Sequence, residues 1–201
     1  MRQRQLGRDA NIDRTQRRAS FKRRVRARMA KTGERYGAAR RVLIEQATDG
    51  RRRTWAADPE FAVGPGEFGL NGLDFGADDT LFVVNYAQGE LYRIPVEAGG
   101  EAGQVELLEV APGLSFPDGM KRRSPDQLLV VEGGIAADSL IDVAGNAAST
   151  TLVIEGLDSP TTAAIVGSDA WVVEGQLDHL FGADPAPPTL PFTVVRVALP
   201  R

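Results

Sequence analysis

One pattern occurs three times in residues 68–201, and it constrains the fold more than any other feature of the chain. Each copy begins with a short polar segment, called the leader below. A short apolar run that ends in Asn or Glu begins 9 or 10 residues after the start of the leader. The leaders begin at Asn71, Asp118 and Thr161, and the runs begin at Leu81, Leu128 and Ala170, 47 and 42 residues apart. A repeat of 40–50 residues built from short β-branched runs is typical of one β-propeller blade.

Further strands are predicted around each copy. Turn residues separate each leader from its run, at 76–79, 123–126 and 167–169, which indicates hairpins. Third strands are expected at 91–96, 139–143 and 193–197, and fourth strands at 105–110 and 151–155. The predicted fold is therefore all-β, a partial β-propeller of about three four-stranded blades. A β-sandwich is the alternative, although it would not explain the matched spacings.

Charge divides the chain into two parts. Residues 1–53 hold 18 Lys and Arg against 5 Asp and Glu, whereas the remaining residues hold 6 against 22. Such an asymmetry marks a compositional boundary. We expect a basic, partly disordered segment at 1–53, a linker at 54–67 and the propeller blades at 68–201.

The basic segment is expected to contain two short α-helices. Phe21, Val25 and Met29 recur every four residues among arginines, and a second apolar stripe begins at Tyr36. Such helices would attract nucleic-acid phosphates, so nucleic acid is one predicted partner. The alternative is a solvated arm that docks on the acidic remainder of the chain.

Several classes of protein are excluded or disfavoured by composition. The chain has no cysteine, so disulfides, thiolate metal sites and Cys–His catalysis are excluded. No run approaches the roughly 20 apolar residues of a membrane helix, so no membrane partner is expected. The arginine-rich start lacks the apolar core of a signal peptide, which makes the cytoplasm the expected location.

Two stretches resemble a known family. "NGLDFGADDTLFVVNYAQGELYRIPV" and "GLSFPDGMKRRSPDQLLVVEGG" are similar to blades of the gluconolactonase, senescence-marker-protein and luciferin-regenerating-enzyme family. The resemblance covers 68–175 and, less clearly, continues to 199. It implies a six-bladed propeller with a divalent metal, calcium or zinc, in the central channel. It also implies hydrolysis of a lactone or another ester.

The resemblance assigns two site residues. Asn71 matches a metal-binding Asn, and Asp118 matches a metal-binding Asp that is also the general base. The alternative is that Asn71-Gly72 and Asp118-Gly119 form tight turns. If first strands start at one face of the blades, second strands end there. Four further side chains would then lie at the rim of the site: Asn85, Glu132, Glu174 and His179.

The chain also departs from the family pattern. A Glu-Gly-Pro type motif, whose Glu supplies a third metal ligand, is absent at its expected place, and the first half of the propeller is missing. We therefore expect a self-association or a partner chain that completes the propeller. Three functions stay open: a metal-dependent lactone or ester hydrolase, a non-catalytic interaction scaffold, and nucleic-acid binding through 1–53. Whether this chain is itself an active enzyme is left open.

Overall fold

The computed structural model describes residues 54–77, 79–181 and 186–200. The chain divides into two compact units, Met1–Thr54 and Trp55–Arg201, and the following description concerns the second. The basic segment 1–53, its two predicted helices and its nucleic-acid role lie outside the described residues. In the part of the chain that is described, no helix is long and apolar enough to cross a membrane.

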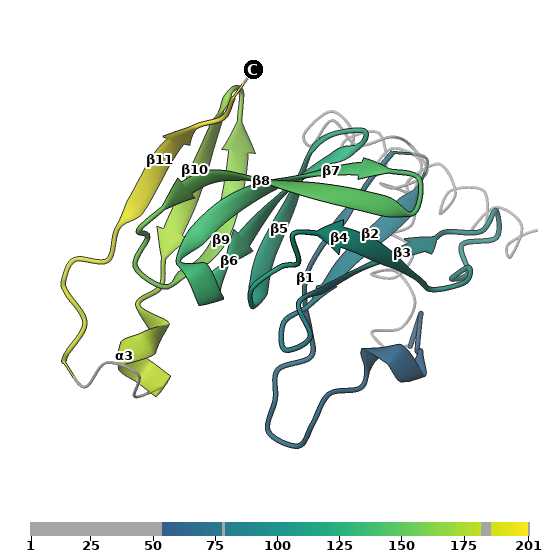
Figure 1. The fold of residues 1–201 in the computed structure, drawn as a ribbon, viewed down its shortest axis with the longest axis horizontal. Helices are drawn as coiled ribbons and strands as arrows, with labels where there is room; N and C mark the ends of the chain where they lie inside the picture. Colours follow the sequence, from purple (N-terminus) through teal and green to yellow (C-terminus); the bar gives the residue numbers. More distant parts are fainter. Residues whose placement is uncertain (1–53, 78, 182–185, 201) are drawn as a thin grey trace, which may run out of the picture. The chain divides into compact units, whose positions relative to one another are not determined.

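Eleven strands form three successive antiparallel meanders in the described residues (Figure 1). The first contains β1 (Leu70–Phe75), β2 (Thr80–Asn85), β3 (Glu90–Pro95) and β4 (Glu106–Ala111). The second contains β5 (Pro117–Ser124), β6 (Gln127–Glu132), β7 (Ala137–Ala144) and β8 (Ala147–Glu155). The third contains β9 (Pro160–Val166), β10 (Asp169–Glu174) and β11 (Val194–Ala198).

This strand order confirms the predicted fold class. Each meander follows the chain, so the unit is a row of three propeller blades rather than a sandwich. The predicted strands are all present, but the third blade has three strands, not four, within the described residues. The outer strands β4 and β8 also pair in parallel, which joins the first two blades into one eight-stranded sheet.

Apolar packing between neighbouring blades forms the core. Strands β2 and β6 are the middle of their blades and are buried on both faces, which explains their unbroken apolar runs. Phe82 and Val84 of the first blade pack with Met120 and Val130 of the second. A second cluster, which includes Val131, joins the second blade to the third.

The buried residues of this core include an aspartate without a polar partner. Asp138 at the start of β7 is fully buried and pairs in register with Val131, as Leu91 pairs with Val84 in the first blade. Neither of its carboxylate oxygens has a hydrogen-bond partner. Burial, followed by the charge of Glu132, raises the pKa of Asp138 to about 7. The second blade thus carries an aspartate where the first carries a leucine.

The residues predicted as a linker, 54–67, contact the outer face of the first blade. Trp55 and Phe61 pack against the cluster that includes Tyr92, and the Phe61 and Tyr92 ring centroids are 5.2 Å apart. The indole Nε1 of Trp55 donates a hydrogen bond to the carbonyl oxygen of Gly100 at 2.8 Å. Phe61 is the last residue of a short 3₁₀ helix, η1 (Pro59–Phe61).

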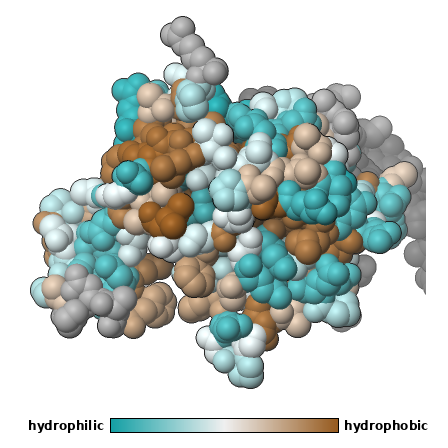
Figure 2. Space-filling model, in the orientation of Figure 1, coloured by the Kyte–Doolittle hydropathy of each residue, from teal (hydrophilic) through white to brown (hydrophobic). Residues whose placement is uncertain are grey.

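The corresponding face of the third blade is exposed. Trp171 and Val173 alternate along β10 and point away from the second blade, with relative exposures of 41 % and 37 %. Val194 of β11 lies opposite Val173 and is 58 % exposed. Figure 2 shows an apolar area over β10 and β11. Among the described residues, this open face is the counterpart of the face that Trp55 and Phe61 cover.

Candidate active site

Each blade begins with the same irregularity in its first strand. Leu70 pairs with Asn85 and Leu73 with Val83, so one extra residue lies between them on β1. The same β-bulge falls between Pro117 and Met120 on β5. The Asn71-Gly72 and Asp118-Gly119 pairs therefore lie inside strands, and the tight-turn alternative is wrong. A bulge re-aims the side chain at its position, here Asn71 and Asp118.

The glycines of these pairs let neighbouring first strands approach. A Cβ atom on Gly72 would lie 2.0 Å from the carbonyl oxygen of Asp118. A Cβ atom on Gly119 would lie 2.6 Å from the Cα atom of Thr162. Because these neighbours are backbone atoms, they cannot rotate away, and only glycine fits. This close packing brings the bulges of the first two blades together.

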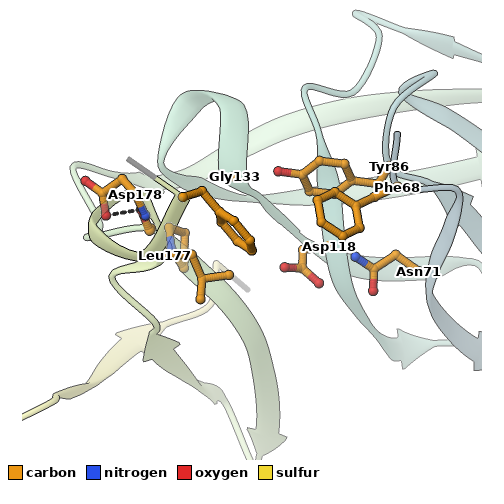
Figure 3. A pocket seen from close by; sticks show the side chains of 10 residues that line it. Phe68, Asn71, Tyr86, Asp118, Gly133, Leu177 and Asp178 are labelled. Carbon is orange, nitrogen blue, oxygen red and sulfur yellow. Dashed lines mark hydrogen bonds between the residues drawn. The ribbon is translucent and has the colours of Figure 1, made fainter. Parts of the chain in front are cut away.

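Asn71 and Asp118 meet in a cavity of about 330 Å³. In Figure 3 the amide nitrogen of Asn71 points towards the Asp118 carboxylate. The rings of Phe68 and Tyr86 lie beside them, with centroids 5.8 Å apart. Ten residues line the cavity: Phe68, Asn71, Tyr86, Asp118, Gly133, Ser159, Pro160, Leu177, Asp178 and Phe181.

The electrostatics of the cavity depend on Asp118. Burial raises the pKa of its carboxyl above the ordinary value, and the Asn71 amide beside it opposes that shift. Burial, with the charge of Asp118 second, raises the pKa of the Tyr86 phenol. Tyr86 is therefore a protonated hydrogen-bond donor at neutral pH. Asp118 is a more basic carboxylate than one in water.

The strand-end residues Asn85, Glu132 and Glu174 do not line the cavity. Glu132 is buried, and its Oε2 accepts a hydrogen bond from the backbone N–H of Ser115 at 2.7 Å. Glu174 does the same for the N–H of Asp158, at 2.9 Å. Asn85 is fully buried, and its side chain hydrogen-bonds that of Gln88. Glu132 and Glu174 thus hold the loops that lead into β5 and β9, and Asn85 holds the turn between β2 and β3.

His179 belongs to a second group of polar side chains beside the cavity. It lies on a short helix, α3 (Leu177–Phe181), that sequence analysis did not anticipate. Candidate ligand atoms of His179, Asp158 and Asp178 all lie within 4.8 Å of one another. The Ser159 hydroxyl donates a hydrogen bond to Asp178 at 2.8 Å. That bond is the largest of several influences that lower the pKa of Asp178.

Aromatic residues at the cavity were also missed by sequence analysis. Phe68 packs against Tyr86 and, at a centroid distance of 5.9 Å, against Phe181. Phe116 packs against Tyr86 at 5.3 Å. A sequence signal did exist, because Phe68 and Phe116 each lie two or three residues before a polar leader. Phe116 also has a φ of 47°, a left-handed conformation that is uncommon before proline and is found at functional sites.

No family model matches the sequence, and neither does any curated protein. Solved structures do match. Virginiamycin B lyase from Staphylococcus aureus is 17 % identical with a TM-score of 0.43, over 56 % of this chain and 36 % of that one. A functionally unknown protein from Desulfotomaculum acetoxidans is 12 % identical with a TM-score of 0.42, over 51 % and 34 %.

Regucalcin from Agrobacterium tumefaciens, described as a calcium-binding protein, is 19 % identical with a TM-score of 0.41, over 65 % of this chain and 47 % of that one. The chain thus spans less than half the length of each of these three structures. Virginiamycin B lyase and regucalcin are both β-propeller proteins. The propeller assignment rests on the strand order itself, and membership of the gluconolactonase family stays a prediction.

Proposed function

We propose that this chain carries part of a divalent-metal-dependent hydrolase site that acts on a lactone or another ester. One observation carries the proposal: Asn71 and Asp118, from equivalent bulges of neighbouring blades, meet in one cavity. Carboxylate and amide oxygens are the ligand types that hard divalent cations such as calcium prefer. The raised pKa of Asp118 additionally suits a general base.

The side chains of Asn71 and Asp118 offer the oxygen ligands that such an ion binds. The Asn71 amide here points its nitrogen at Asp118, and a half-turn of the amide would place its oxygen there instead. Two adjacent oxygens of this kind repel each other unless a cation lies between them. Two protein ligands leave the remaining positions to water, to substrate or to a further protein surface.

The side chains divide the chemistry between them. A bound divalent cation supplies polarisation of a carbonyl and a more acidic water. Asp118 accepts the proton of the attacking water, and its burial makes it a stronger acceptor than a solvated carboxylate. Tyr86 keeps its proton and donates a hydrogen bond to a substrate oxygen. Phe68 shields the reacting atoms from bulk water.

The test compares thermal melts of the full chain in EDTA, calcium and zinc, using wild type, Asp118→Asn and His179→Gln. Calcium at about 100 times its dissociation constant stabilises a folded protein by about 2.7 kcal/mol. For a chain of this size, that raises the midpoint by roughly 5–10 °C. We expect Asp118→Asn to lose the calcium response and His179→Gln to keep it. A response that survives in Asp118→Asn refutes the site.

Turnover is then measured on a panel of lactones and aryl esters, with release of acid followed by titration. We expect hydrolysis that requires calcium and is lost in Asp118→Asn. If calcium stabilises the wild type but no substrate in the panel is hydrolysed, the metal site stands and the hydrolase activity does not. The chain would then be the non-catalytic scaffold that was the alternative.

A further inference from the structure

The mouth of the cavity is formed by aromatic rings that are exposed to solvent. Phe181, Phe68 and Tyr86 form a continuous series of ring contacts, and Phe116 extends it from the second blade. Phe68 is 59 % exposed and Phe181 is 64 % exposed. Phe68, Tyr86 and Phe181 line the cavity, and Phe68 and Phe181 stay largely exposed despite these ring contacts. A ligand that covers them would gain the contact area that the folded chain leaves open.

The charge inside the cavity has one sign. Among the described residues that line it, Asp118 and Asp178 carry charge, and no lysine, arginine or histidine is present. Figure 3 places these two carboxylates on opposite sides of the cavity, with Asp118 beside the Phe68 and Tyr86 rings. The face of an aromatic ring is itself the negative end of a quadrupole. Carboxylates and rings therefore attract the same ligand class, a cation with an apolar body.

We infer that the cavity binds a small organic ammonium ion, with its charge at Asp118 and its alkyl groups against Phe68 and Phe181. A neutral apolar ligand would displace water from the Asp118 carboxylate and leave its charge uncompensated. A bare metal ion would leave the rings exposed. A volume of about 330 Å³ is at the lower end for small-molecule sites and suits an ion of choline size.

This inference goes beyond the proposed function, because an ammonium ion at Asp118 would compete with a metal ion for the same carboxylate. The binding step can be tested apart from hydrolysis. The probes are choline and 3,3-dimethylbutan-1-ol, which has the same shape but no charge. Binding to the full chain is measured by calorimetry in EDTA and low-salt buffer, with potassium as a control for non-specific attraction to acidic surface.

We expect choline to bind at least about tenfold more tightly than the neutral alcohol, and Asp118→Asn to abolish that preference. Phe68→Leu keeps an apolar side chain but removes the ring face, so choline affinity should fall roughly two- to tenfold. Phe68 is largely exposed, and its replacement leaves the core intact. Phe192→Leu is the matched control, because Phe192 is 56 % exposed and does not line the cavity.

Equal affinity for choline and the neutral alcohol would overturn the inference, as would equal losses in Phe68→Leu and Phe192→Leu. Displacement of choline by potassium at the same concentration would also overturn it. The two proposals fail separately. Selective choline binding without a calcium response leaves the ammonium site and removes the metal-dependent hydrolase. A calcium response without choline selectivity leaves the metal-dependent hydrolase and removes the ammonium site.

Discussion

Replacing Asp138 by leucine should stabilise the protein, and increasingly so as the pH rises. Asp138 is fully buried without a hydrogen-bond partner, and the equivalent residue of the first blade is already a leucine, Leu91. Ionising a carboxyl in such surroundings costs free energy because water no longer solvates the charge. Leucine removes the charge and matches the apolar neighbours, among them Val131.

The magnitude follows from the pKa of Asp138, about 7 in the folded protein against 3.8 as the reference value. The pKa of Asp138 is higher in the folded than in the unfolded protein. The contribution of Asp138 to the free energy of unfolding is therefore complete at a pH below its unfolded-state pKa, and it is lost as the pH rises through about 7. Each pKa unit corresponds to about 1.36 kcal/mol, so wild type should lose about 3 kcal/mol relative to Asp138→Leu between pH 5 and pH 8.

The assay is urea denaturation of wild type, Asp138→Leu and Asp142→Asn at half-unit steps from pH 5 to pH 8. Asp142→Asn removes an exposed aspartate from the same strand and is the matched control. The free energies of unfolding of wild type and Asp138→Leu should diverge with pH. Two parallel curves would show that Asp138 keeps its ordinary ionisation and that the reasoning from burial is wrong.

Two further substitutions test the packing around the inner strands. Gly119→Ala should lower the free energy of unfolding by about 1–3 kcal/mol, because the new Cβ overlaps the β9 backbone. In a chemical-denaturation comparison, Gly113→Ala should cost far less, since a Cβ there meets no atom within 4 Å. Glu132→Ala should cost about 1–3 kcal/mol by leaving the Ser115 N–H without its acceptor. The control for Glu132→Ala is Glu155→Ala, because Glu155 is an exposed residue at the end of a strand. Equal losses of unfolding free energy in the two variants would contradict the assigned role of Glu132.

Strand positions could be predicted from the sequence because they depend on local alternation and turn residues. The runs that begin at Leu81 and Leu128 became β2 and β6, and the run at 139–143 became part of β7. Residues around Asn71 and Asp118 could be placed at a common edge because their spacing repeats. Their convergence on one cavity depends on two bulges and two glycine contacts, which no spacing encodes.

Other features depend on tertiary contacts that the sequence does not show. Glu132 at a strand end has the pattern of a solvated acid, and its burial depends on the loop that its carboxylate holds. Helix α3 spans only five residues, too few for a periodic signal. Trp55 was assigned to a linker because the surrounding sequence has little regular pattern, although its ring packs on the first blade.

The difference between the two end blades sets a limit on how copies of this unit can assemble. Head-to-tail stacking would join the face with Trp171 and Val173 to the outer face of another first blade, and repetition would give a filament of unlimited length. Trp55 and Phe61 already occupy that second face. A pairing of two β10 faces, in contrast, uses the same face on both copies, and a contact of that symmetry is complete with two molecules. A change that displaced residues 55–61 would remove this limit and make polymerisation, not only loss of stability, its consequence.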